Sequence, residues 1–100
     1  MSETAAIPPD AAIERALEVS HELSETGELI LFDQEKSEVV MFNAMGACIW
    51  ELIDGRRTAR ELVDFIVEAR GAEKERPVIE RDVFAFLREL VGRRSIRLRV

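Results

Sequence analysis

Glu38–Gly55, with the sequence EVVMFNAMGACIWELIDG, is the stretch that decides the fold. It opens with the apolar run Val39–Phe42, which is too short for a helix and predicts a strand. Asn43 follows, and its side chain can accept hydrogen bonds from the free N–H groups of a helix's first turn. The segment Ala44–Ile53 is apolar almost all round, as a fully buried helix is. Gly55 then ends the helix, because glycine readily takes a positive φ. A strand therefore runs directly into a buried helix.

Further strands are predicted upstream of this stretch. Leu17–Leu23 alternates apolar and polar side chains with the period of two of a half-buried strand. Glu28–Phe32 is a second apolar run, and short polar turns join these two to Val39–Phe42, which predicts an antiparallel meander. Residues 1–12 contain two adjacent prolines and no periodicity, so we expect a flexible N-terminal segment there. The composition of Ala11–Leu17 also allows a short helix.

Two more helices are predicted downstream. Thr58 and Glu61 have the spacing of a capping box, which starts a helix that Gly71 ends. Pro77 fits the first turn of a third helix, because its missing N–H is not needed there, and we expect that helix to run to Val91 before Gly92.

The order of these elements predicts an α+β fold. Ser95–Val100 alternates again and suggests a short terminal strand. The fold class is winged helix-turn-helix-like, with a three-stranded antiparallel β-meander followed by a three-helix bundle. We expect one domain over residues 13–100, after the flexible segment 1–12.

Composition restricts the function. The chain has 100 residues, 47% hydrophobic and 34% charged, and a net charge of −6. An acidic chain does not suit nucleic acid or an anionic membrane as a partner. No apolar run approaches the length that spans a bilayer, and the N-terminus lacks the layout of a signal peptide. We therefore expect a cytoplasmic protein with no membrane partner.

Catalytic chemistry is hard to build from these residues. His21 is the only histidine and Cys48 the only cysteine. Cys48 falls among apolar neighbours in the predicted central helix, so we expect a small buried thiol rather than a nucleophile. No glycine-rich phosphate loop is present. The sequence predicts no enzyme activity, no metal site and no cofactor.

The third predicted strand carries the first clue to function. Val39–Phe42 is apolar on both faces, although a strand with one face in water should alternate. The free edge of a meander is an open row of N–H and C=O groups. Helices could cover this edge, or a peptide could add there as a fourth strand. An unpaired apolar edge could equally pair with its own copy, so a homodimer stays open.

The third predicted helix carries the second clue. At roughly 100° per residue, one stripe of apolar side chains is wide enough to dock the helix on the core. The stripe consists of Ile79, Val83, Phe86, Leu87 and Leu90. Phe84 lies well off its centre, so this aromatic ring either widens the core or lines a groove.

DNA binding is the alternative function, because the helical part resembles a helix-turn-helix. A winged helix-turn-helix DNA-binding regulator would carry clustered basic or amide side chains on its recognition helix. The segment Thr58–Arg70 offers two arginines but also Glu61, Asp64 and Glu68, whose charges repel phosphate. The residues therefore disfavour nucleic acid.

The central stretch also resembles a protein family. The positions that carry the resemblance are Phe42-Asn43, Ala47, Ile49-Trp50, Leu52-Ile53, Asp54-Gly55 and Thr58. They are similar to the signature of PqqD-like proteins, the peptide-recognition elements of ribosomal peptide modification. The resemblance extends from about Leu17 to about Leu98. PqqD proteins of pyrroloquinoline quinone (PQQ) biosynthesis usually lack the Ile-Trp pair, so the chain resembles the wider PqqD-like group.

The resemblance implies a function and a site. PqqD-like proteins act as peptide chaperones: they bind the leader segment of a precursor peptide between the third strand and the third helix. They present it to a modifying enzyme, often a radical S-adenosylmethionine (SAM) maturase. Carried over to this chain, the peptide-binding residues are Val39, Val40, Met41, Phe42, Arg81, Phe84, Ala85 and Arg88. The two arginines would suit acidic or carbonyl groups of the leader.

Overall fold

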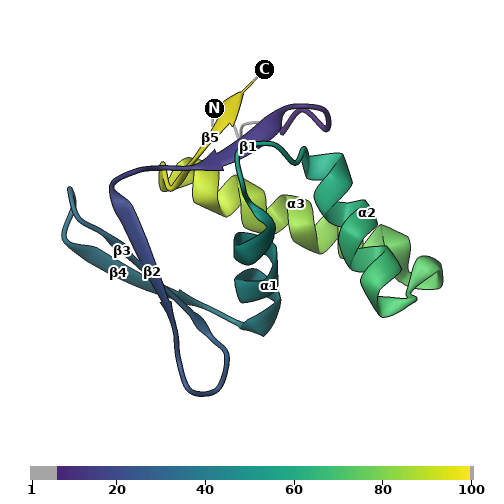
Figure 1. Ribbon diagram of the computed structural model, residues 1–100, viewed down its shortest axis with the longest axis horizontal. Coiled ribbons are helices and arrows are strands. Elements are labelled where there is room, and N and C mark those ends of the chain that lie inside the picture. The colour runs from purple at the N-terminus through teal and green to yellow at the C-terminus, as the bar shows by residue number, and fades with distance from the viewer. Residues whose placement is uncertain (1–6, 100) are drawn as a thin grey trace, which may run out of the picture.

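The computed structural model describes residues 7–99, and this part of the chain forms two small sheets and three α-helices (Figure 1). The elements are, in order, β1 (Ala12–Arg15), β2 (Val19–Leu23), β3 (Leu29–Asp33), β4 (Glu38–Phe42), α1 (Ala44–Leu52), α2 (Ala59–Arg70), the 3₁₀ turn η1 (Glu73–Glu75), α3 (Arg76–Gly92) and β5 (Ile96–Arg99). The predicted α+β fold with a three-stranded antiparallel meander is confirmed.

The larger sheet has the strand order β2-β3-β4, and the second sheet joins β1 to β5. In the larger sheet Leu31 of β3 lies opposite His21 of β2 and Val40 of β4. Residues directly opposite one another share a face, so these side chains point the same way as the buried Leu29 and Leu31. That face packs on the core, while β2 and β4 form the two edges of the sheet.

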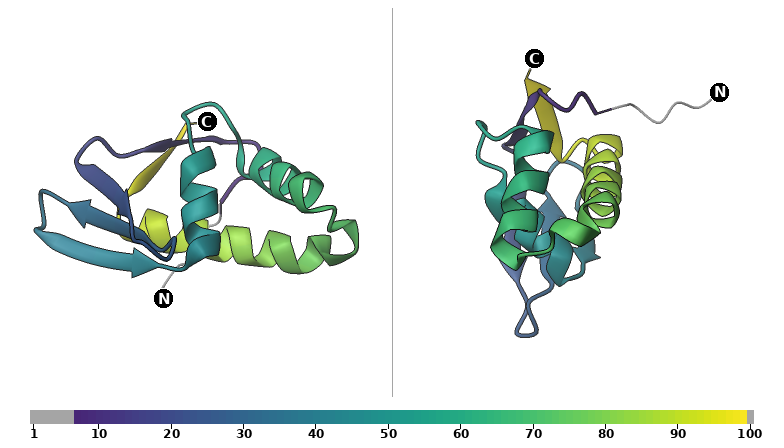
Figure 2. Two further views of the ribbon diagram at one scale, coloured as in Figure 1. Left: turned by 60° about the horizontal axis from the view of Figure 1, so that its bottom comes forward. Right: turned by 90° about the vertical axis from the view of Figure 1, so that its right-hand side faces the viewer.

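Helix α1 stands between the larger sheet and α2, with α3 running beneath it toward the sheet (Figures 1 and 2). Ile49 and Trp50 of α1 are fully buried at the centre of the core. The β1 strand is fastened to this helix by Arg15, which donates to the Trp50 carbonyl at 2.7 Å and lies over the indole ring. Burial lowers the pKa of Arg15. The predicted central helix is therefore the element around which the others pack.

Three of the helix ends expected from the sequence are confirmed, whereas α1 ends at Leu52 with Ile53 as its cap, and Gly55 takes its positive φ in the loop that follows. The Asn43 side chain accepts from the Gly46 N–H at 3.0 Å, and Thr58 and Glu61 form the reciprocal capping box. Between α1 and α2, the Asp54 carboxylate accepts from two successive backbone N–H groups, which lowers its pKa. Gly71 ends α2 in the left-handed conformation.

The N-terminal region differs from the prediction. Ala12–Arg15 is a strand, not part of a helix, because its pairing with Ile96–Arg99 outweighs a weak helix propensity. Ile7 and Ala11 are buried, and Pro9 accepts from the Arg60 N–H at 3.0 Å. The expected flexible segment therefore does not include residues 7–12, and its first six residues lie outside the described range. The domain boundary at residue 13 stays a prediction.

Three smaller expectations were wrong. Leu17 lies in the turn before β2 and is 91% exposed, so it does not continue the half-buried alternation of that strand. Cys48 is exposed, because the apolar surface of α1 extends further round the helix than its neighbours cover. α3 continues through Gly92 and does not end at Val91, and the residue with positive φ beyond it is Arg94.

Candidate functional site

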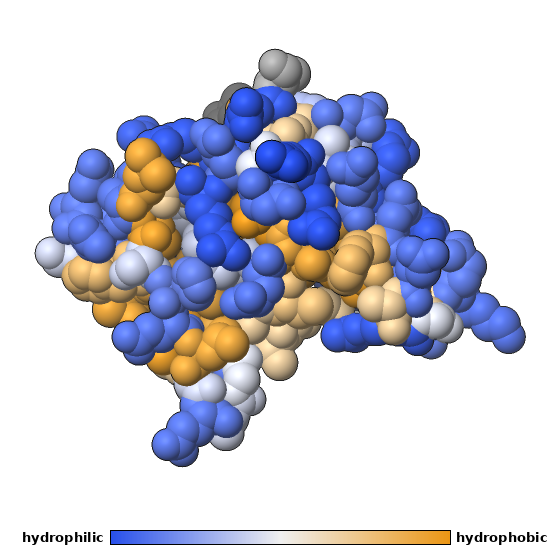
Figure 3. Space-filling model, viewed as in Figure 1, coloured by the Kyte–Doolittle hydropathy of each residue, from blue (hydrophilic) through white to orange (hydrophobic). Residues whose placement is uncertain are grey.

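The candidate site is an open groove where the end of β4, the first turns of α1 and the middle of α3 meet. Its lining residues are Met41, Phe42, Asn43, Met45, Gly46, Ile49, Asp82, Ala85, Phe86 and Glu89. Most of this lining is apolar. Hydrophobic side chains also reach the surface over the part of the molecule where the larger sheet and α1 lie (Figure 3). Apolar surface that stays in contact with water is typical of an interaction site.

Gly46 makes the floor of the groove possible. The Phe42 and Phe86 rings meet edge to face, with centroids 4.9 Å apart and an interplanar angle of 87°. A Cβ atom at Gly46 would lie 2.8 Å from the Phe42 Cβ, closer than Cβ atoms pack, and 3.0 Å from the Phe86 Cε1, which is also a tight contact. The missing side chain at position 46 therefore lets β4, α1 and α3 approach one another.

The outer edge of β4 has main-chain groups that β3 does not use. Ser24 N–H bonds to Glu28 C=O at one end of the β2–β3 pair, and Gln34 N–H bonds to Glu18 C=O at the other. Hydrogen-bonded and non-bonded pairs alternate in an antiparallel ladder, so β3 turns Leu29, Leu31 and Asp33 toward β4.

The same alternation fixes the direction of the β4 groups. Glu38, Val40 and Phe42 lie opposite the β3 residues that face β4, and they bond to β3. Val39 and Met41 therefore direct their N–H and C=O groups away from the sheet. Within residues 7–99 this edge pairs with no other strand.

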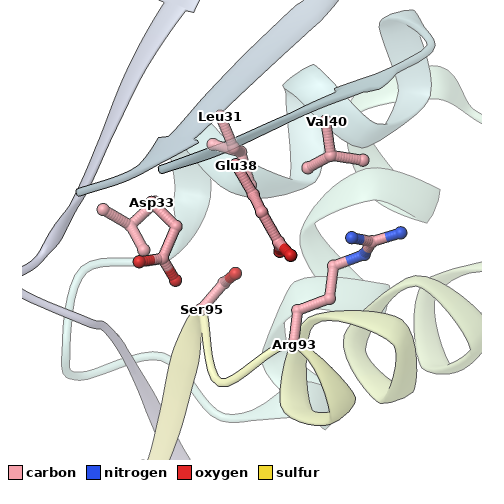
Figure 4. A pocket seen from close by; sticks show the side chains of 7 residues that line it. Leu31, Asp33, Glu38, Val40, Arg93 and Ser95 are labelled. Carbon is pink, nitrogen blue, oxygen red and sulfur yellow. The ribbon is translucent and has the colours of Figure 1, made fainter. Parts of the chain in front are cut away.

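A second hollow lies near the other end of β4, where the β3–β4 hairpin meets the end of α3. A small pocket there is lined by Val19, Leu31, Asp33, Glu38, Val40, Arg93 and Ser95, six of which are labelled in Figure 4. Lys36 Nζ donates to the Arg93 carbonyl at 2.9 Å, and Arg93 Nε donates to Glu89 at 2.7 Å. These contacts tie the hairpin to α3 and hold the edge of β4 beside the helix.

The outer face of the sheet is a second apolar surface at the same edge. Phe32 lies opposite Val39, and Ile30 opposite Met41, on the face that points away from the core. Val39 and Met41 are 61% and 55% exposed. Any strand added to β4 would place alternate side chains beside these two residues.

The structure gathers only part of the predicted peptide-binding set at the groove. Met41, Phe42 and Ala85 line it, and Val39 and Val40 belong to the same strand. Sequence reasoning missed Met45, Gly46, Asp82, Phe86 and Glu89. The helical spacing 82, 85, 86 and 89, one face of α3, was the signal that could have found the α3 residues.

Phe84 lies away from the groove. It packs against the core cluster and lines a separate cavity with Pro9, Val63 and Glu80. The N-terminal segment from Ile7 onward occupies that side of α3, which the sequence did not reveal. Arg88 follows Phe84 by one helical turn on the same side, and Arg81 is an exposed residue beside Asp82. These three residues do not line the groove.

Within residues 7–99, a three-stranded sheet with an unpaired edge and a helix beside that edge form a small α+β domain. An edge of this kind can pair with an added strand. A family model described as "Coenzyme PQQ synthesis protein D (PqqD)" matches residues 28–96. The chain belongs to the PqqD family. A comparison with curated protein sequences gave no match.

Two solved structures are similar to this chain. One is the structure of TbiB1 in complex with the TbiA(beta) leader peptide, with 25% sequence identity and a TM-score of 0.70. The match covers 84% of this chain and 94% of the TbiB1 chain. The PqqD truncation of Methylobacterium extorquens PqqCD is described as a functional, stand-alone recognition element for ribosomally synthesised and post-translationally modified peptides. It is 18% identical, with a TM-score of 0.77, and covers 96% of this chain and 99% of its own.

Proposed function

We propose that this chain binds the leader segment of a ribosomally made precursor peptide by β-strand addition to β4, and presents it to a modifying enzyme. The single observation that carries the proposal is the unpaired edge of β4 beside an apolar groove. Main-chain bonds to Val39 and Met41 would supply affinity for any extended segment. Side chains that enter the groove would select the sequence. Family membership and the leader complex of TbiB1 support this proposal.

The residues that we propose for contact differ in part from the sequence-based set. Val39, Val40, Met41, Phe42 and Ala85 remain. Phe86, Met45 and the two acidic side chains of the α3 face join them, because they line the groove. Phe84, Arg81 and Arg88 would contact only those parts of a peptide that extend beyond the groove.

We further propose a role without catalysis, in the cytoplasm, where ribosomes make the precursor. Among the groove residues, the polar side chains are Asn43, Asp82 and Glu89, and Asn43 is engaged in capping α1.

The partner would be a modifying enzyme, for example a radical SAM maturase. A homodimer formed through sheet edges, a role in PQQ biosynthesis and the winged helix-turn-helix-like description of α1–α3 likewise remain proposals. No helix within residues 7–99 is long and apolar enough to cross a bilayer.

The DNA-binding alternative finds no support. A DNA-binding protein of this kind would place α2 in the major groove of DNA, but α2 exposes Glu61, Asp64 and Glu68. The net charge of −6 adds long-range repulsion from phosphate. A gel-shift assay at low salt should therefore show no retarded duplex.

Hydrogen exchange tests the proposed function. The probe is a synthetic peptide that carries the leader of a ribosomally made precursor from the organism that encodes this chain. On binding, the amide protons of Val39 and Met41 should exchange more slowly, because they become ladder hydrogen bonds. The amides of His21 and Leu23 on β2, which also point away from β3, serve as the matched control and should not change. Protection of β2 in place of β4, or no binding, would refute the proposal.

A further inference from the structure

The charged side chains of the groove point to the chemistry of the peptide. The α3 residues in the lining are Asp82, Ala85, Phe86 and Glu89, which share one face of the helix. Two of the ten residues that line the main groove are charged, and both of them are acidic. The small pocket at the other end of β4 adds Asp33 and Glu38 against one base, Arg93. A ligand in this groove meets more negative charge than positive.

The two acids of α3 differ in how they are paired. Glu89 accepts from Arg93 at 2.7 Å, four residues along the same helix. Asp82 has a weaker contact, 3.4 Å to the Nε of its neighbour Arg81. The side chains of Asp82 and Arg81 are 49% and 71% exposed, so water screens this ion pair. Asp82 is therefore the carboxylate of the groove that can take a charged partner from a ligand.

The surroundings of Asp82 fit a long basic side chain. Ala85 and Phe86 line the same groove and offer apolar surface for a row of methylene groups. Lysine and arginine lay their stems on such surface and keep the charged end at a carboxylate. A short or purely apolar side chain would use the floor of the groove and leave the charge of Asp82 unused.

We infer that the recognised peptide carries a lysine or arginine on a side chain that faces α3, paired with Asp82. This makes Asp82 a specificity-determining residue of the site. The inference rests on the proposed function, because it assumes a strand bound along β4. It also reverses the charge preference that Arg81 and Arg88 suggest from the sequence.

The test selects the ligands without knowing the precursor. A phage-displayed library of random peptides of about ten residues, enough for one strand with flanks, is panned on the intact chain. Peptides that bind at least about tenfold more weakly to the Met41→Pro variant, which lacks one edge donor, are kept as groove ligands. These ligands should share a lysine or arginine at one position.

A double-mutant cycle then assigns the pairing. In a selected peptide, replacing that basic residue by glutamine should weaken binding to the wild-type chain about fivefold, as for a well-formed exposed ion pair. The same replacement should cost nothing on Asp82→Asn. An Asp82→Lys variant should prefer the peptide with glutamate at that position. Glu80→Gln, which removes a carboxylate from another side of α3, is the matched control and should behave as wild type.

The outcomes separate the two proposals. If groove ligands share no basic residue, or if the glutamine replacement costs as much on Asp82→Asn as on wild type, the pairing with Asp82 is wrong while strand addition stands. If no selected peptide is sensitive to Met41→Pro, strand addition along β4 is itself refuted.

Discussion

β2 and β4 are the two edges of one sheet, yet only β4 has the surroundings of a binding site. Both strands direct alternate main-chain groups away from β3. β2 has the sequence VSHEL, with four exposed residues, and β4 has EVVMF. An edge alone therefore offers hydrogen bonds to any extended chain, and the neighbouring elements decide which edge is used.

The neighbours of the two strands explain the difference. The groove beside β4 has a floor built from α1 and a wall built from α3. His21 of β2 instead packs edge to face against Trp50, with ring centroids 6.0 Å apart. A peptide on β2 would gain main-chain hydrogen bonds, each worth only about 1 kcal/mol net in water, and little apolar burial. Such an edge binds too weakly to be specific.

The largest expected effect comes from a substitution in α1 that pushes β4 away from α3. Gly46→Ala places a Cβ against the backbone-proximal Phe42 Cβ, which cannot move aside without shifting the strand. We expect the free energy of unfolding to fall by about 1–3 kcal/mol, as for overpacking elsewhere. Urea titration measures this. Gly92→Ala is the control, since nothing lies near that position and alanine favours a helix. Equal stability of both variants would mean that the groove is loosely packed.

The next largest effect comes from removing a main-chain hydrogen-bond donor from the edge of β4. Met41→Pro removes an outward N–H of β4, and an edge strand tolerates proline, so the fold should persist. We expect binding of the leader peptide to weaken about tenfold, the loss of one main-chain hydrogen bond together with poorer packing. Isothermal titration calorimetry gives the affinity. Met41→Ala separates the side chain from the donor.

The matched change on the other edge is Leu23→Pro, which removes an outward N–H from β2. Leu23 is 52% exposed, so the substitution should disturb the core little. Peptide affinity should stay at the wild-type value. A similar loss from both prolines would show that the two edges are equivalent, or that proline acts through stability.

The local features of this chain could be predicted from its sequence, because they depend on residues close together. Asn43 as a cap, the Thr58–Glu61 box and the positive φ at Gly71 follow from the chemistry of one turn. Trp50 in the core follows from apolar residues on every side of it. The meander follows from strands joined by short turns.

The features that the sequence could not decide depend on distant parts of the chain. β1 has a helix-favouring composition, and it becomes a strand by pairing with β5, more than eighty residues later, and by hydrogen bonds to the loop between α1 and α2. Phe84 and Phe86 are both aromatic residues on α3, and their angles alone do not say which neighbour covers each side. The N-terminal segment covers the side of Phe84, so Phe86 is the ring that faces the groove.

A smaller effect is expected from the outer face of the sheet. Val39→Thr keeps the shape of the side chain and makes its exposed surface polar. A peptide strand on β4 would place a side chain directly beside this residue, and cross-strand pairs contribute roughly 0.2–1 kcal/mol. We therefore expect binding to weaken about twofold to threefold, with stability unchanged because Val39 is already 61% exposed. No change in calorimetry would mean that the bound peptide is polar on its outer face.

The smallest expected effect comes from giving β2 the composition of β4. Ser20→Val with Glu22→Met places apolar residues on the outer face of β2, opposite Phe32 and Ile30, as Val39 and Met41 are on β4. If composition made the site, the variant would bind a second peptide, and the calorimetric stoichiometry would rise from one to two. We expect it to stay at one, because the added surface has no helix wall to enclose a ligand. A second equivalent would show that a free apolar edge is sufficient, and that the groove beside α3 selects among peptides without being needed to hold them.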